Sequence, residues 1–383
     1  MNEEEVDIDS WEEEDVEVTA VSVKDSKENQ LRVIRTNKDY DLDYLVKSVG
    51  DNIMLGPHYQ RRSRWSVSQK SLLIESFLLN IPIPPIFLYE GDFHEYEVVD
   101  GRQRLEAIRD FFNDDFRLRG LVYFPELNKL KYSEIGQDNQ RLLKRRSMSA
   151  TILLAESRGF DELDLRMLLF DRLNTGGIKL NAQELRNAIF YGTFNDLLEE
   201  LSSNPIFRKI WGIPIPIEGS ELFERHTKSL HNNSLYKAMI DCELVLRVFG
   251  LIEVYNGFVE GSMKQILDHT MKRYRSSDSS ILDPMKLRFL KAIIFIDETF
   301  GDDAIKNLTL DPPKKARNIY DSLMVAHGLI ADSDFKSESV IKDNLMKTLG
   351  DEDKYDRIIT KGNSIDNMKF RVDQAKLIFS SNL

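Results

Sequence analysis

The feature that most constrains the fold is an ordered run of patterns in the first third of the chain: a helix, a proline stop, two strands and the start of a second helix. SVSQKSLLIESFLLN (66–80) has apolar residues at helical spacing, with Ser66 at the N-cap and Gln69 at the capping-box position. The following IPIPP ends this helix, because proline cannot continue the hydrogen-bond ladder. IFLYE (86–90) and YEVVD (96–100) then predict two strands joined by a turn. The run therefore predicts a small sheet on which the apolar face of a helix packs.

Flanking segments enlarge this unit and continue it into a helical region. LRVIRT (31–36) predicts a short strand, DLDYLVKSV (41–49) a helix with Asp41 as its cap, and FRLRGLVYF (116–124) extended structure. From about residue 160 the pattern is almost wholly helical, with expected helices at 163–174, 181–202, 221–231, 234–252, 262–275, 284–300, 315–330 and 337–349. The expected fold class is α+β: a small mixed-sheet module followed by a mainly α-helical region.

Charge is distributed unevenly along the chain. Residues 1–18 hold ten acidic side chains and no Lys or Arg, so they account for −10 of the formal net charge of −12. Mutual repulsion and the scarcity of apolar residues predict a disordered acidic tail over residues 1–25. The alternative is that this tail imitates nucleic-acid phosphates and covers a basic groove. The rest of the chain is close to neutral and can carry a local basic surface.

Several classes of protein are excluded by what the chain lacks. Cys242 is the single cysteine, which rules out an intramolecular disulfide and a cysteine-based zinc site. No apolar run reaches about eighteen residues, as a membrane-spanning helix requires. The acidic N-terminus has neither the basic nor the apolar region of a secretory signal. We therefore expect a cytoplasmic protein with no membrane partner.

The first candidate site is VVDGRQR, a buried strand that ends in Asp100 and is followed by a helix extending to about Phe112. Gly101 permits a tight turn and the close approach of a ligand. The helix start offers amide groups and a partial positive charge that suit a phosphate, and Arg102 and Arg104 add forked donors. Asp100 is placed to hold a metal ion or to orient a water. The alternative is that Asp100 only caps the helix while both arginines are solvated.

A second cluster of cationic groups precedes the first helix. YQRRSRW (59–65) places them between Tyr59 and Trp65. One helix and one hairpin separate this turn from the turn at Gly101, and that connectivity brings both turns to one edge of a small sheet. An anionic ligand held between them is the functional interpretation. An ordinary surface loop is the alternative.

The third segment is FDRLNTGGIKLNAQELRN (170–187), in which a glycine pair allows a tight turn before a helix. Asn181 is the expected N-cap of that helix, and Glu184 stands at its capping-box position. A well-capped connection between two helices explains the same residues without a ligand. The spacing of a Walker A loop occurs nowhere in the chain.

Together, these motifs resemble the N-terminal domain family of GmrSD-type restriction endonucleases, catalogued as domain of unknown function 262 and built on a ParB/sulfiredoxin-like fold. YKAMIDCELVLRVFG (236–250) also fits the helix that follows the core of that family. The resemblance covers roughly residues 30–250. The usual DGQQR string of the family is DGRQR here, so Arg102 adds a cation beside the phosphate site that the resemblance implies.

The resemblance implies a domain organisation and a function. A ParB-like nucleotide-binding domain would occupy residues 26–150, a helical continuation of the family core residues 151–252, and a helical region of unrecognised type residues 253–383. Members of the family bind and often hydrolyse nucleoside triphosphates, and couple this to restriction of foreign or modified DNA. The chain would thus be an NTPase of a bacterial or phage-related defence system.

Functional positions are carried over residue by residue from the matching motifs. Asp100 and Arg104 would be the catalytic residues, and Asp100 would bind the Mg²⁺ that accompanies the nucleotide. The positions implied to bind nucleotide are Tyr59, Gln60, Arg61, Trp65, Gly101, Arg102, Gln103, Asn174, Gly176, Gly177, Lys179, Glu184 and Arg186.

Intrinsic DNA cleavage is not expected from this chain. Many members of the family carry a second domain with an HNH-type nuclease motif, but residues 250–383 contain only His269 and His327, without metal-ligand spacing. His226 and His231 are five residues apart and share a helical face poorly, so we interpret them as surface or partner residues. Direct DNA nicking that depends on Asp100 is a third, less favoured reading.

The alternative function is a non-catalytic subunit that binds DNA and recruits a separate nuclease or defence-system subunit. RLLKRRS (141–147), with Lys129 and Lys131 nearby, is the segment that would contact the DNA backbone. A solvated helix face explains the same basic cluster.

Overall fold

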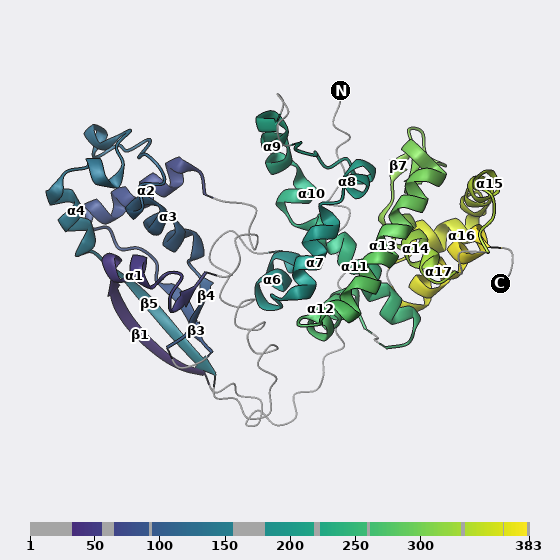
Figure 1. The fold of residues 1–383 in the computed structure, drawn as a ribbon, viewed down its shortest axis with the longest axis horizontal. Coiled ribbons are helices and arrows are strands. Elements are labelled where there is room, and N and C mark those ends of the chain that lie inside the picture. Colours follow the sequence, from purple (N-terminus) through teal and green to yellow (C-terminus); the bar gives the residue numbers. More distant parts are fainter. Residues whose placement is uncertain are drawn as a thin grey trace. The chain divides into compact units, whose positions relative to one another are not determined.

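The structure, a computed structural model, describes residues 33–55, 65–91, 94–155, 181–217, 223–258, 261–330, 334–362 and 364–380. The chain divides into two compact units with the boundary between Ile189 and Phe190. Within the described residues, the first, here called the sheet unit, combines a five-stranded sheet with helices (Figure 1). The second, the helical unit, is helical apart from a two-stranded ribbon. The expected α+β class is confirmed.

The sheet of the first unit is mixed. Its strands are β1 (Val33–Asp41), β2 (Ile53–Met54), β3 (Ile86–Glu90), β4 (Tyr96–Asp100) and β5 (Ser147–Ala155). They are arranged in the order β1-β5-β3-β4-β2. β5 runs antiparallel to β1 and parallel to β3, whereas β4 runs antiparallel to β3 and parallel to β2. The hairpin expected from IFLYE and YEVVD is therefore β3 and β4.

Helices cover one face of this sheet (Figure 1). They are α1 (Leu42–Ser48), α2 (Val67–Leu79), α3 (Arg102–Phe112) and α4 (Gln137–Lys144), with 3-10 turns at Pro125–Leu127 and Tyr132–Glu134. Ser66 and Gln69 form the expected capping box, since the Ser66 amide donates to Gln69 Oε1 at 2.9 Å and the Gln69 amide to Ser66 Oγ at 3.3 Å. Asp41 stands at the N-cap of α1, but its side chain makes no capping hydrogen bond.

The segment 116–124, expected to be extended, forms no strand. Side chains of α2 take the place of a neighbouring strand as hydrogen-bond partners. The Arg119 amide donates to Ser71 Oγ at 2.9 Å, and the Tyr123 amide donates to Oε1 of the buried Glu75 at 2.7 Å. Because these amides are satisfied by a helix, the segment buries Leu118 and Leu121 without joining the sheet, while Val122 and Tyr123 stay exposed.

Strand β5 is absent from the elements that the sequence predicted. It lies between β1 and β3, and Ala150, Thr151, Ile152 and Leu153 are all buried. The basic cluster just before it has a structural role at its end. Arg146 donates to the carbonyl oxygens of Phe77 at 2.8 Å and Leu78 at 3.3 Å, which caps the C-terminus of α2.

The helical unit is built around α11 (Ile240–Tyr255), whose residues from Leu244 to Val254 are all buried. α11 packs against α7, α12, α14 and α17. The remaining elements are α7 (Thr193–Ser202), α8 (Pro205–Trp211), α9 (Phe223–Asn232), α10 (Ser234–Lys237), α12 (Met263–Tyr274), α13 (Ser279–Phe300), a 3-10 turn (Gly301–Asp303), β6 (Lys306–Asn307), β7 (Lys314–Lys315), α14 (Arg317–His327), α15 (Glu338–Leu349), α16 (Glu352–Tyr355), the π-helix η6 (Asp356–Thr360) and α17 (Ile365–Phe379). Among the helices that the structure describes, none has the length and apolar character needed to span a membrane.

Two of the expected helices are broken. The helix expected at 181–202 is α6 (Ala182–Ile189) followed by α7, and the chain between them passes so close to Arg275 that a Cβ at Gly192 would lie 2.1 Å from its carbonyl oxygen. The helix expected at 234–252 is interrupted at Met239, which has φ 58° and separates α10 from α11. Helix α17 was missed.

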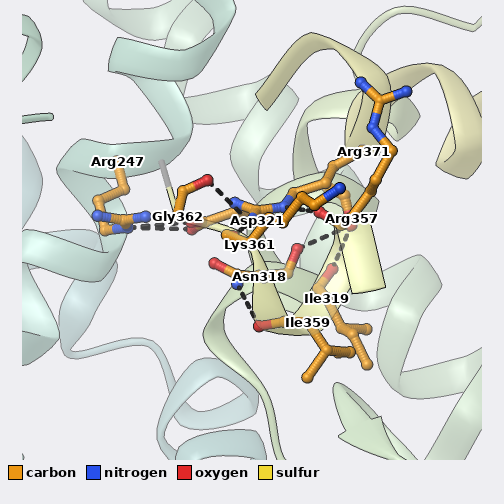
Figure 2. A network of polar contacts seen from close by, with 10 residues as sticks. Arg247, Asn318, Ile319, Asp321, Arg357, Ile359, Lys361, Gly362 and Arg371 are labelled. Carbon is orange, nitrogen blue, oxygen red and sulfur yellow. Dashed lines mark hydrogen bonds and ion pairs between the residues drawn. The ribbon is translucent and has the colours of Figure 1, made fainter. Parts of the chain in front are cut away.

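A buried polar network joins α11, α14, η6 and α17 (Figure 2). Arg247 forms a bidentate pair with Asp321, with Nε and Nη2 at 3.0 and 2.5 Å from Oδ2. Arg371 donates to the carbonyl oxygens of Arg357, at 3.1 Å, and of Lys361. Burial lowers the pKa of Arg371 to about 10, against the attraction of Asp321. The network fastens the end of the π-helix to the centre of the helical unit.

Candidate functional site

The candidate site is the junction between β4 and α3. β4 ends at Asp100, Gly101 occupies the N-cap with φ 95° and ψ 9°, and α3 begins at Arg102. A Cβ at Gly101 would lie 2.4 Å from Cγ2 of Ile86. Both the left-handed backbone and the contact with β3 therefore require glycine, independently of any ligand.

Arg104 holds this junction together. Its Nη2 donates to Asp100 Oδ2 at 2.8 Å, and its Nη1 donates to the carbonyl oxygens of Pro85, at 3.1 Å, and Pro84. Its side chain is 13% exposed, whereas that of Asp100 is 33% exposed. One guanidinium thus connects the end of β4, the first turn of α3 and the proline segment before β3.

Arg102 has a different partner. Its Nε donates to Glu106 Oε1 at 2.8 Å, and both side chains are largely buried, at 11% and 14% exposed. Arg102 and Arg104 are two residues apart, so they point about 200° from one another around the helix axis. Each guanidinium is therefore paired with its own carboxylate.

The first turn of α3 contains no acidic residue, and Gly101 has no side chain with which to cap it. The helical hydrogen bonds begin with the amides of Arg104 and Leu105, which donate to the Gly101 carbonyl oxygen at 3.0 and 3.1 Å. Anions are favoured at such a helix start.

The other end of α3 is anchored to α2. Asp110 accepts hydrogen bonds from Lys70 Nζ at 2.7 Å and from Arg109 Nη2 at 2.8 Å. Desolvation alone would raise the pKa of the Asp110 carboxyl, but these hydrogen bonds outweigh it and hold that pKa below its usual value. This ion-pair cluster joins α3 to α2 at the end of α3 that is far from the candidate site.

The other described positions implied by the resemblance have contacts with partners outside the β4–α3 junction. Trp65 is half-buried and packs against the core of the sheet unit. Glu184 forms the expected capping box with Asn181, its Oε2 accepting the Asn181 amide at 3.0 Å, and Arg186 is buried and donates to Gln183. Outside the described residues lie Tyr59, Gln60, Arg61, Asn174, Gly176, Gly177 and Lys179.

The residues of the junction do not fit a dedicated metal site. Among the described residues, no group of three or more His, Cys, Asp or Glu side chains is placed to hold a metal ion. Oδ2 of Asp100 already accepts from the Arg104 guanidinium, whose positive charge repels a divalent cation.

Sequence reasoning missed the partners of the two arginines. Arg102 with Glu106 and Asp100 with Arg104 are both spaced by four residues, a signal of ion pairing that the sequence does contain. The carbonyl oxygens of Pro84 and Pro85 carry no such signal, because they lie far from Arg104 along the chain.

Comparison with known proteins agrees with the resemblance read from the motifs. Residues 42–191 match the family described as GmrSD restriction endonuclease, N-terminal domain, and this span contains the whole junction of β4 and α3. Comparisons with curated proteins and with solved structures gave no match. Residues 42–191 of the chain are therefore similar to the N-terminal domain of GmrSD restriction endonucleases, which suggests a protein of a restriction or defence system.

Proposed function

We propose that the sheet unit binds and hydrolyses a nucleoside triphosphate at the junction of β4 and α3, in the service of a system that restricts foreign or modified DNA. The observation that carries the proposal is the geometry of that junction: a strand ends in a carboxylate directly before an Arg-Gln-Arg helix start with no acidic residue in its first turn. The family match over residues 42–191 supports the restriction setting.

In this proposal, the phosphates lie against the first turn of α3. The partial positive charge of the helix start favours the phosphate oxygens. Arg102 moves from Glu106 to the phosphate, which replaces one charge-assisted hydrogen bond by another. Arg104 stays with Asp100 and the proline carbonyls, so it acts as a positioning residue.

Asp100 has one oxygen left for the reaction. Arg104 holds Oδ2, and Oδ1 accepts a hydrogen bond from the attacking water and orients it toward the terminal phosphate. Mg²⁺ would accompany the triphosphate and neutralise part of its charge.

A nucleotide panel tests this proposal. Melting temperature is measured with ATP, GTP, CTP and UTP in the presence of Mg²⁺, and phosphate release is then measured with each nucleotide that raises it. We expect Asp100→Asn to retain the bond to Arg104 and the binding of nucleotide, but to lose phosphate release. Asp138→Asn, at an exposed carboxylate of α4, is the control and should behave as the parent chain. The proposal fails if no nucleotide raises the melting temperature or if Asp100→Asn releases phosphate at the parent rate.

A DNA-binding adaptor is the second candidate, favoured by the exposed basic side chains of α4. Those of Arg141 and Lys144 are 73% and 51% exposed, and Arg145 follows them on the surface. This function predicts DNA binding that weakens steeply with salt, and no phosphate release. Fluorescence anisotropy with a DNA duplex, comparing the parent chain with Arg141→Ala/Lys144→Ala, separates the two candidates.

A further inference from the structure

Strand β1 forms one edge of the sheet. It is nine residues long and pairs with β5 on one side, and among the described residues no strand pairs with its other side. All residues from Ile34 to Asp39 are exposed. A long edge of this kind presents a row of amide and carbonyl groups to a further strand.

The register shows which residues of β1 direct these groups outward. Asn37 lies opposite Thr151, and the Leu42 amide, which continues the same register, donates to the Arg146 carbonyl oxygen at 2.8 Å. In an antiparallel ladder every second residue bonds to a given neighbour. The even-numbered residues of β1 therefore face β5, while Arg35, Asn37 and Asp39 direct their backbone groups to the open edge.

The sequence of β1, VIRTNKDYD, is complementary to itself when it is reversed about Asn37. Reversal places Arg35 opposite Asp39, and the apolar Ile34 opposite Tyr40. Because side chains alternate along a strand, the charged pair lies on one face of the sheet and the apolar pair on the other.

We propose that two copies of this chain associate through β1, in antiparallel pairing about a two-fold axis at Asn37, to form one continuous sheet. Arg35 of each copy then faces Asp39 of the other, giving two symmetric ion pairs, and each outward amide meets an outward carbonyl.

Neighbouring registers fit less well. A two-fold axis at Thr36 or at Lys38 also places the outward-facing residues of one copy opposite the outward-facing residues of the other. The first places Arg35 opposite Asn37 and loses both ion pairs. The second places Arg35 opposite Asp41 but also places Lys38 opposite itself, which is repulsive. The axis at Asn37 is therefore favoured over both.

The apolar side chains at this edge support the same partner. Ile34 and Tyr44 are each 44% exposed, and Tyr40 stacks on Tyr44 with ring centroids 5.1 Å apart. Pairing brings Ile34 of one copy against Tyr40 of the other and covers this cluster. A single strand pair buries less than the roughly 1,600 Å² of a standard interface, so we expect dissociation in the micromolar range.

A charge swap tests the pairing. Molar mass of the full chain is measured across the micromolar range by light scattering or sedimentation. Arg35→Asp and Asp39→Arg should each abolish the dimer, because each single change places like charges opposite one another twice. The double variant Arg35→Asp/Asp39→Arg should restore it. A parent chain that stays monomeric, or single variants that dimerise as well as the parent, would overturn the proposal.

Cysteine cross-linking tests the register. The two copies of residue 37 face one another about 5.5 Å apart between Cα atoms, within the range of a disulfide. The two copies of residue 35 are offset by four residues, or about 13 Å. Asn37→Cys should therefore form a covalent dimer on oxidation, whereas Arg35→Cys should not, and the single native cysteine, Cys242, is fully buried. A disulfide dimer from Arg35→Cys alone would contradict the axis at Asn37.

Discussion

Arg104 lies across the start of α3 from Asp100, with Nη2 at 2.8 Å from Oδ2, and its other terminal nitrogen reaches the carbonyl of Pro85. The Arg104 guanidinium and the Asp100 carboxylate, which the sequence suggests for ligand binding, thus bind each other and stabilise the turn. A junction fixed in this way keeps its geometry without a ligand, so that binding does not have to order it. Arg102 pairs instead with Glu106, one turn further along α3.

Gly101→Ala should destabilise the sheet unit through two effects that a control can separate. The left-handed backbone at φ 95° disfavours any side chain, and the added Cβ would meet Ile86. Gly50 has a similar φ of 90°, but nothing lies within 4 Å of its Cβ position. Urea unfolding should show a loss of about 1 kcal/mol for Gly50→Ala and about 2–4 kcal/mol for Gly101→Ala. Equal losses would mean that the contact with Ile86 has no energetic role.

We expect the hydrogen-bond acceptor of Glu75 to contribute more to stability than its negative charge. It is buried, and its Oε1 accepts the amides of Tyr123 at 2.7 Å and Phe124 at 3.2 Å. Glu75→Ala leaves both amides without this acceptor and should lower the free energy of unfolding by about 2–3 kcal/mol. Glu75→Gln keeps a carbonyl oxygen at the same place and should lose much less. If the two variants are equally destabilised, the two amide bonds do not explain the burial of Glu75.

Stability below pH 4 should depend on Asp110. A carboxyl whose pKa is depressed in the folded state stabilises the fold above its unfolded pKa, and this contribution is lost as pH falls through the folded pKa. Asp110→Asn should therefore be less stable than the parent chain at neutral pH, with a difference that shrinks below the ordinary value of 3.8. Denaturant unfolding as a function of pH measures this. Asp138→Asn, at a fully exposed side chain, should follow the parent curve throughout.

The buried pair of Arg247 and Asp321 should be costly to break on one side (Figure 2). Their side chains are 2% and 7% exposed, so removing one charge leaves the other buried without its partner. Asp321→Asn should lower the free energy of unfolding by about 3–5 kcal/mol. Replacing both, as Arg247→Met/Asp321→Leu, should recover most of that loss. A double variant as unstable as the sum of its single changes would show that the pair is not energetically coupled.

The parts of the fold that the sequence predicts are those with local signals. The capping box at Ser66, the proline stop and the hairpin of β3 and β4 are each encoded within a few residues. β5 was missed although polar and apolar residues alternate from Ser147 to Ile152, a local signal that is typical of a strand. The break at Gly192, by contrast, depends on Arg275, far along the chain.

The candidate site likewise has features that the sequence predicted and features that it did not. The strand end, the glycine turn and the helix start were predicted, and the match over residues 42–191 confirms the family that their motifs resemble. The ion pairs that occupy Arg102 and Arg104 were not predicted, although their spacing of four residues permits it. Arg104 binds the proline segment only because folding brings β3 beside β4, which spacing alone does not reveal.

The most direct test of the central claim is calorimetric titration of a nucleoside triphosphate into the parent chain, Arg102→Ala and Arg109→Ala. Arg109 lies on the same helix at its far end, paired with Asp110, and controls for the loss of one arginine from α3. If phosphates bind at the Gly101 turn, Arg102→Ala should weaken affinity by about tenfold or more, the loss of a charge-assisted hydrogen bond, while Arg109→Ala should leave it unchanged. Equal affinity in all three proteins, or no binding to the parent chain, would contradict a nucleotide site at the start of α3.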